Sequence, residues 1–410
     1  MKPLAVVAVA VALLALAAAC KAAEEAPPTS SAVATPSPEP TATPSAGPTG
    51  SARLVFIRPI SEPGLGRGVL WVADADGSNA HPISPEDAQA AWAGTVNAGV
   101  EDLLYYVTYD GETARTLWEF SEATGQRRRV FSFQSRTAYE AFASVSPDGR
   151  YATFTDTQNQ SVKLFDMQTG ETRLLLQGNA SACELGAGGC FGYRSSRWSP
   201  DGRLLQVNKG FYEGSRPVVI DPFAADIEEI EAGTAQSVWG DGWGPQSDAF
   251  CGTHSYGGTG LYLARAPSWE MRDLVPEYNV AGTPAPRTER YIRACDWLNA
   301  NVVAFATATA AIPGQYPAIP DWWLEVSVLD LDGQGPETVT TIDVDGQLSD
   351  LDILVLPGVD SVLIEYFRDP AGAGEFFASQ PELIDLTSGE LSPILQEGDW
   401  VVGVVEMPTP

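Results

Sequence analysis

Short stretches of alternating apolar and polar residues, separated by turns rich in Asp, Gly and Pro, cover the chain from Leu54 onward. The clearest unit begins at Ala143–Val145, passes through a Pro-Asp-Gly turn, and continues with alternating stretches at 151–154, 162–166 and 172–176. Alternation with a period of two residues, interrupted by turns of this composition, is typical of β-strands joined as hairpins. The pattern therefore predicts a four-stranded antiparallel unit here.

One turn is repeated within this pattern. Ser-Pro-Asp-Gly-Arg occurs at 146–150 and again at 199–203, each time between two predicted strands. Such Asp and Gly residues have a local explanation, because Asp accepts hydrogen bonds from nearby backbone N–H groups and Gly tolerates positive φ. A calcium loop needs more oxygen ligands than these turns offer. A turn that recurs at this spacing predicts a stacked or radial architecture. Related Asp–Gly turns follow strands at 74–77, 124–125, 330–333 and 385–389.

The segment Leu70–Asn79 (LWVADADGSN) closely resembles the third-strand motif of TolB-like β-propeller repeats. Both Ser-Pro-Asp-Gly-Arg turns stand where that family places its Pro-Asp pair, and the segments beginning at Trp243 and Trp297 are similar to worn copies. The resemblance implies an all-β β-propeller, and counting the strand–turn units along the chain predicts seven four-stranded antiparallel blades. It implies little about function, because such propellers have many roles.

The two ends of this pattern complement each other. No inner strand precedes Leu54–Arg58 in the first blade, and one strand, Trp400–Val405, is left over after the last blade. We expect the C-terminal strand to become the inner strand of the first blade. Closing the ring in this way removes exposed sheet edges that would otherwise favour aggregation.

The N-terminus has the features of a secretory signal. Lys2 is followed by the apolar run Leu4–Leu16, which is short for a membrane span, and by small residues before Cys20. The stretch resembles a bacterial lipobox, although Ala17 stands where that family prefers Leu. The resemblance implies that residues 1–19 are removed and that Cys20 carries a lipid. An ordinary signal peptide with an incidental Cys is the alternative.

Residues 20–51 consist mostly of Pro, Ala, Thr, Ser and Gly, with almost no large apolar side chain. Such a segment cannot bury enough surface to offset its ordering entropy, so we expect a disordered stalk. No comparable linker interrupts 52–410, which we expect to form a single propeller domain. Together these segments predict an extracytoplasmic protein, lipid-anchored to the bacterial cell membrane.

The chain is strongly acidic, with a formal net charge of −29 from 24 basic and 53 acidic residues. A field of this sign opposes nucleic acid and anionic lipid headgroups. We therefore expect a monomer that contacts the membrane only through its anchor. As partner we expect a protein or an envelope polymer and no nucleic acid.

Beyond Cys20 there are four cysteines, an even number that suggests disulfides in an exported chain. Cys183 and Cys190 enclose a flexible Gly-rich span and are expected to pair, which leaves Cys251 for Cys295. The spacing of Cys251 and His254 would also suit a metal, but this is the weaker alternative, since the chain has only two histidines. We expect no cofactor; Ca²⁺ remains the alternative.

Several predicted connections between second and third strands are long, and long connections in a compact domain are often binding loops. They lie at 60–67, 210–215, 254–260, 307–321 and 368–381. Aromatic residues and Arg in such loops suit the core of an interface, although the aromatic side chains could equally pack their own loops down. The candidate binding residues are Tyr212, His254, Tyr256, Tyr316, Trp322, Trp323, Arg368 and Phe376.

The sequence contains no Gly-x-Ser-x-Gly elbow and no Walker loop, and the Gly-rich segment 240–244 is not followed by a predicted helix. No catalytic residue can be nominated among so many carboxylates by spacing alone. The leading hypothesis is a non-catalytic binding module. The alternatives are a propeller enzyme, similar to a lactonase or lyase, that uses channel carboxylates, and a structural subunit of an envelope complex.

Overall fold

The computed structural model describes residues 50–60, 68–94, 102–110, 113–134, 143–156, 160–179, 191–211, 214–232, 238–254, 260–275, 287–312, 321–333, 335–345, 347–369 and 378–408. All of them belong to one compact unit, Pro48–Pro410. Every regular element in these ranges is a β-strand. Within the same ranges, no helical segment could cross a lipid bilayer.

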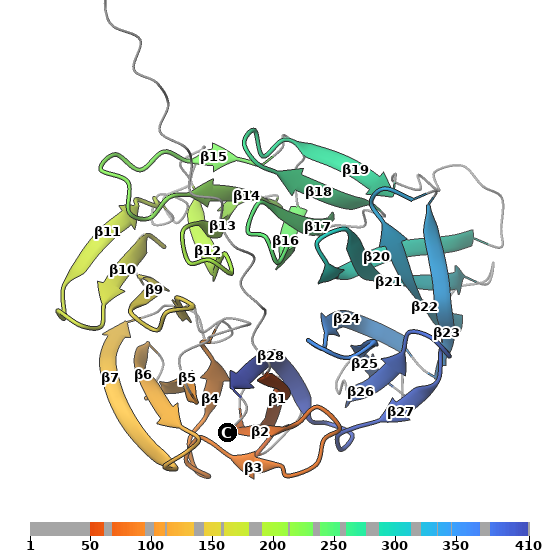
Figure 1. The fold of residues 1–410 in the computed structure, drawn as a ribbon, viewed down its shortest axis with the longest axis horizontal. Coiled ribbons are helices and arrows are strands. Elements are labelled where there is room, and N and C mark those ends of the chain that lie inside the picture. The colour runs from red at the N-terminus through yellow and green to blue at the C-terminus, as the bar shows by residue number, and fades with distance from the viewer. Residues whose placement is uncertain are drawn as a thin grey trace, which may run out of the picture. The chain divides into compact units, whose positions relative to one another are not determined.

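Seven four-stranded antiparallel sheets, here called blades 1 to 7, form a closed ring (Figure 1). From the centre outward, blade 1 consists of β28 (Trp400–Pro408), β1 (Gly50–Arg58), β2 (Val69–Asp74) and β3 (His81–Pro82); blade 2 of β4 (Ala90–Trp92), β5 (Leu103–Tyr109), β6 (Ala114–Ser121) and β7 (Gln126–Gln134). Blade 3 consists of β8 (Ala143–Val145), β9 (Tyr151–Thr155), β10 (Val162–Asp166) and β11 (Thr172–Leu176); blade 4 of β12 (Gly192–Trp198), β13 (Leu205–Phe211), β14 (Gly214–Ile220) and β15 (Ile230–Glu231).

Blade 5 consists of β16 (Val238–Trp243), β17 (Ala249–His254), β18 (Leu261–Arg265) and β19 (Met271–Val275); blade 6 of β20 (Arg287–Asn299), β21 (Val302–Ile312), β22 (Asp321–Asp330) and β23 (Pro336–Val344). Blade 7 consists of β24 (Gln347–Val355), β25 (Ser361–Asp369), β26 (Ala378–Asp385) and β27 (Leu391–Pro393). A hydrophobic cluster fills each seam between neighbouring blades. The predicted seven-bladed all-β fold is confirmed.

The ring closes as the sequence predicts. β28 pairs antiparallel with β1, in a register that runs from Gly50 opposite Pro408 to Ile57 opposite Trp400. The C-terminal strand therefore supplies the innermost strand of the blade that the N-terminal strand begins (Figure 1). Without β28, the inner edge of β1 would present unpaired backbone groups to the channel.

Two buried carboxylates hold the beginning of β28. Asp399, which is 2% exposed, accepts hydrogen bonds from Nε and Nη2 of Arg58 at 2.8 and 2.7 Å. Glu365 on blade 7 is fully buried and accepts the backbone N–H of Val401 at 2.9 Å. Charge-assisted hydrogen bonds of this kind are stronger than neutral ones. The closing strand is therefore tied to both of its neighbours, blades 1 and 7.

A row of tryptophans links the inner strands of blades 3 to 6. The indole N–H of Trp198 donates to the Ser144 carbonyl oxygen of the preceding blade at 3.2 Å. Trp243 donates in the same way to Arg197 at 3.1 Å, and Trp297 to Gly242 at 2.9 Å. Trp198 and Trp243 end their inner strands, and Trp297 lies two residues before the end of β20. The segments at Trp243 and Trp297 therefore occupy the positions expected of degenerate repeats.

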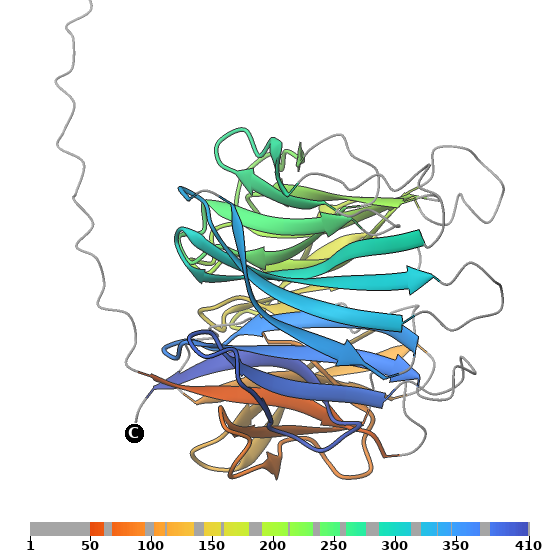
Figure 2. The same ribbon diagram turned by 90° about the vertical axis from the view of Figure 1, so that its right-hand side faces the viewer.

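The ring has two different faces. The tight turns, at 75–80 and 146–150 for example, lie on one face, here called the turn face. The connections from second to third strands and from blade to blade lie on the opposite face, here called the loop face. Arg53 of β1 lies opposite both Asp74, where a tight turn begins, and Val405 of β28. The described chain therefore enters and leaves on the turn face, together at the left of Figure 2.

Some connections on the loop face are shorter than predicted. In blade 4, Phe211 pairs with Gly214, so 210–215 is a tight hairpin and not a long loop. In blade 6, β21 continues to Ile312 and β22 already begins at Asp321. The strands extend further than the hydrophobic pattern suggests because backbone pairing continues through Ala, Thr and Gly.

Deleting residues from Trp400 to the end should abolish cooperative unfolding, because it opens the ring and leaves the buried Glu365 without the backbone N–H of Val401. Thermal unfolding followed by circular dichroism measures this. The control is a deletion of residues 409–410, which lie beyond β28 and should leave the midpoint unchanged. An unchanged midpoint after the longer deletion would show that the ring does not depend on this strand.

Candidate functional site on the inner strands

Most of the predicted binding residues lie where the structure gives no description of their side chains. Cys20, Cys183, Cys190, Tyr212, Tyr256, Tyr316 and Phe376 fall outside the described residues, and the backbone alone of His254 is described, at the end of β17. The Cys183–Cys190 pairing and the lipidation of Cys20 therefore remain predictions.

The other three predicted binding residues are on strands and not on loops. Trp322 and Trp323 lie near the beginning of β22, and Arg368 lies near the end of β25. Trp322 packs against the hydrophobic cluster between blades 6 and 7, so it lies on a strand and not on the predicted loop. Arg368 donates from Nη2 to the Glu397 carboxylate at 3.3 Å.

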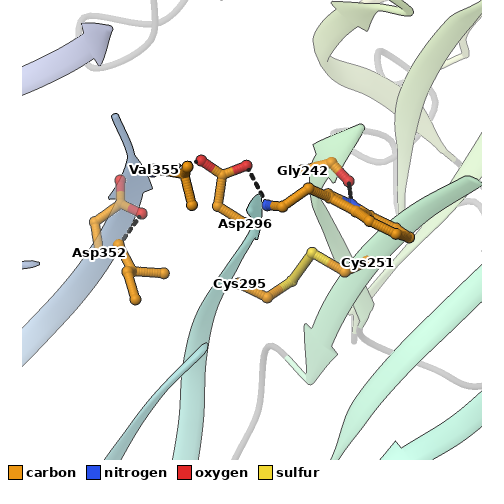
Figure 3. The surroundings of a disulfide bond; sticks show 8 residues. Gly242, Cys251, Cys295, Asp296, Asp352 and Val355 are labelled. Atoms are coloured by element: carbon orange, nitrogen blue, oxygen red, sulfur yellow. Dashed lines mark hydrogen bonds between the residues drawn. A yellow bond between two sulfur atoms is a disulfide. The ribbon is translucent and has the colours of Figure 1, made fainter. Parts of the chain in front are cut away.

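The predicted Cys251–Cys295 disulfide is present, with the two Cα atoms 6.3 Å apart. It joins β17 of blade 5 to β20 of blade 6, within the hydrophobic cluster that fills the seam between them. In Figure 3 it lies directly beside Asp296, the residue that follows Cys295 on the inner strand.

Asp296 presents a half-buried carboxylate where blades 5, 6 and 7 meet. Its Oδ1 accepts the backbone N–H of Trp297 at 2.8 Å, and its Oδ2 accepts that of Val355, on the inner strand of blade 7, at 2.8 Å (Figure 3). The Asp296 side chain thereby connects β20 and β24, the inner strands of blades 6 and 7. Blades 6 and 7 are joined here by a group that can change its charge.

Burial raises the pKa of Asp296 from an ordinary value of 3.8 to about 6. The N–H groups of Val355 and Trp297 and the positive charge of Arg197 all lower this pKa, but they do not outweigh the loss of hydration. The carboxyl group therefore changes its protonation near neutral pH, where a group can both give and take a proton.

A glycine lets the backbone of blade 5 approach this carboxylate closely. A Cβ atom on Gly242 would lie 3.0 Å from Oδ1 of Asp296 and 3.2 Å from the Cys295 carbonyl oxygen. Gly242 occupies the position in blade 5 that Arg197 has in blade 4 and Asp296 has in blade 6, immediately before the Trp. The exposed Arg197 and Asp296 therefore hold equivalent positions on either side of Gly242, and the charge of Arg197 acts on the Asp296 carboxylate.

An acid with a near-neutral pKa beside an Arg is a candidate for proton transfer or for binding a small polar molecule. Among the residues that the structure describes, no group of three or more His, Cys, Asp or Glu side chains is arranged to hold a metal ion. Sequence reasoning missed Asp296 because one carboxylate among 53 acidic residues carries no distinguishing spacing. The feature of the sequence that could have identified Asp296 is its position immediately before Trp297, in a degenerate copy of the repeat.

No protein-family model matches the sequence, and a comparison with curated proteins finds no match. Solved structures do match. An oligogalacturonate lyase from Vibrio parahaemolyticus is similar at a TM-score of 0.54 and 10% identity, over 85% of this chain and 86% of that one. The periplasmic gluconolactonase of Pseudomonas aeruginosa is similar at 0.53 and 13%, over 88% and 99%. The common architecture is the β-propeller.

At these identities the likeness shows the fold alone. A TolB-like protein of Agrobacterium tumefaciens also matches, with a TM-score of 0.41 and 13% identity over 73% of this chain and 100% of that one. A score of that size carries no argument by itself. The propeller therefore rests on its own seven blades and on the two enzyme structures.

Replacing Asp296 by Asn should raise the free energy of unfolding, relative to that of the wild-type protein, by more at pH 8 than at pH 4. The folded-state pKa lies above the unfolded one, so the wild-type protein loses stability as the pH rises from about 4 to above 6, and the Asn variant does not. The pKa difference sets an upper limit of about 3 kcal/mol, and solvent screening of a half-buried group reduces the expected effect to about 1–2 kcal/mol. Urea unfolding at both pH values measures it.

Asp385→Asn is the control with the opposite sign. Asp385 accepts N–H bonds from Ser388 and Thr387, which hold its pKa below the ordinary value. Its ionised form therefore contributes stability above the unfolded pKa, and the Asn variant should be less stable at pH 7 and unchanged at strongly acidic pH. If Asp296→Asn lowered the free energy of unfolding at neutral pH, as Asp385→Asn should, the assignment of a raised pKa to Asp296 would be wrong.

Proposed function

We propose that this chain is an extracytoplasmic, lipid-anchored β-propeller that binds a protein or polymer of the cell envelope with its loop face. The observation that carries the proposal is the polarity of the ring. Gly50 and Pro408 pair with each other at the turn face, so the described chain begins and ends on the side opposite the loop face. A propeller held in this way presents its connecting loops to whatever lies beyond the membrane surface.

The composition of the chain supports the same proposal. The net charge of −29 keeps such a domain from adhering to anionic lipid headgroups, so contact with the membrane is left to the anchor. Connections that join strands on a rigid scaffold are common positions for binding residues. Of the predicted binding residues, Trp323 and Arg368 lie at the loop-face ends of their strands.

Replacing Cys20 by Ser should release the protein from the membrane fraction, because the substitution removes the thiol that would carry the lipid. Fractionation of cells followed by immunoblotting measures the change. A Cys251→Ser variant serves as the control, since it removes a cysteine of the seam disulfide and leaves the anchor. A wild-type protein found entirely in the soluble fraction would contradict the anchor.

Capture of a partner should depend on which face is left free. Single cysteines introduced at Asp332 on the turn face and at Gln396 on the loop face, both exposed, allow the same domain to be coupled to beads in two orientations. Beads coupled at Asp332 should capture a saturable partner from detergent-solubilised envelope, and beads coupled at Gln396 should not. Equal capture in both orientations would place the binding surface elsewhere.

A second candidate function is enzymatic, and Asp296 is the observation that favours it. A carboxyl group with a pKa of about 6 on an inner strand, facing Arg197, suits acid–base chemistry on a small polar substrate. The similar structures of a gluconolactonase and an oligogalacturonate lyase support testing sugar lactones and uronate oligomers first. Turnover that is lost in Asp296→Asn, while the domain remains folded, would favour the enzyme over the binding module.

A further inference from the structure

The seam between blades 5 and 6 changes character along its length. Its central part is apolar and contains the disulfide, with Phe305 of β21 packed against Cys251 and Cys295. Toward the loop face the same surface of β21 continues with Thr307 and Thr309, because residues two apart in a strand point to the same side. These two threonines are 0% and 4% exposed.

The neighbouring strand carries this polar surface outward. Thr307 pairs with Glu325 of β22, and Thr309 pairs with Trp323. Side chains of such cross-strand partners lie beside one another on one face of a sheet. Trp323 and Glu325 are both half-buried, so they stand at the outer margin of the seam while the threonines lie behind them.

Blade 5 provides the opposite wall. Thr253 of β17 lies two residues beyond Cys251 on the surface that faces blade 6, and it pairs with Leu261 of β18. Thr253 is 2% exposed and Leu261 is fully buried. The loop-face end of this seam therefore combines hydroxyl groups, a carboxylate, an indole and apolar carbon.

One of these hydroxyl groups has no partner. Oγ1 of Thr307 is buried and accepts or donates no hydrogen bond within the described part of the chain, which costs free energy that a Val of the same shape would not cost. A buried polar group left unsatisfied in this way requires an explanation, and a bound molecule that supplies the missing hydrogen bond is one.

The two neighbouring tryptophans of β22 lie on opposite sides of the strand. Trp322 packs into the hydrophobic cluster between blades 6 and 7, whereas Trp323 faces the other way and is not part of the clusters that the described side chains form. A half-buried indole beside buried hydroxyls offers a flat apolar surface with polar groups at its edge. Ligand sites commonly combine apolar surface with a few placed polar groups.

We propose that the loop-face end of the seam between blades 5 and 6, here called the seam site, binds a neutral glycan. A sugar ring would stack on Trp323 and exchange hydrogen bonds with Glu325 and the threonines behind it. The net charge of −29 disfavours an anionic polymer, and a polyhydroxylated ligand without charge fits the hydroxyl-rich wall. The proposal deepens the proposed binding function by giving its ligand class, and it rests on that function.

The chain offers a matched pair of variants as the test. Trp323→Ala should weaken binding of the purified domain to neutral oligosaccharides on a glycan array, and in titration calorimetry with the best of them, by about tenfold or more. Trp322→Ala, one residue away on the opposite side of the same strand, should leave the dissociation constant unchanged and lower the melting temperature. Equal effects of the two substitutions on binding would overturn the proposal.

Thr307→Val separates a ligand role from a structural one. The substitution removes the unpartnered hydroxyl, so the melting temperature of the free domain should stay the same or rise, while glycan binding should weaken by about threefold to tenfold. Unchanged glycan binding in this variant would remove Thr307 from the site. If binding also survives in Trp323→Ala, the whole seam site is refuted.

The ligand class is tested with a cationic counter-probe, hexalysine. We expect glycan binding that does not change with salt concentration and no saturable binding of hexalysine at the seam site. Failure of every neutral glycan on the array, or hexalysine binding that Trp323→Ala removes, would overturn the proposal. If oriented beads still captured a partner in either case, the proposed binding function would stand and its ligand class alone would fall.

Discussion

The whole ring depends on the pairing of β28 with β1. Every other blade consists of strands that follow one another in the chain, whereas blade 1 requires two segments from opposite ends of the domain to meet. The fully buried Glu365 and nearly buried Asp399 both hold the beginning of β28, and each would be costly to leave without its partner. Buried, charge-assisted polar contacts therefore lie where two distant segments of the chain must meet.

Polar links between inner strands continue around part of the ring. Trp198, Trp243 and Trp297 each donate to a carbonyl of the preceding blade, and after the last of them the Asp296 carboxylate accepts the N–H of Val355. A Trp indole cannot change its charge, but a carboxyl group with a pKa of about 6 can. The junction of blades 5, 6 and 7 thus carries a link whose charge depends on pH, where the other links described between inner strands do not.

The sequence predicts the fold well because a propeller repeats one local pattern. Period-two alternation and the Ser-Pro-Asp-Gly turns predicted blade 3 nearly residue by residue, and the unmatched strands at both ends predicted the closure. The candidate sites were harder to predict. Whether Trp322 or Trp323 enters the core depends on which side of β22 each faces, and the prediction had placed both before the strand begins. The importance of Asp296 comes from burial by three blades, which no local pattern encodes.

The position of β28 at the end of the chain also sets the order of events in folding. Residues 400–408 are the last part of the ring to be synthesised. Until they emerge from the ribosome, the inner edge of β1 has no strand to pair with. An exposed edge of this kind is a template for pairing with another chain, and long-range closure is slow. A ribosome that stalls before residue 400 would leave an open, aggregation-prone ring.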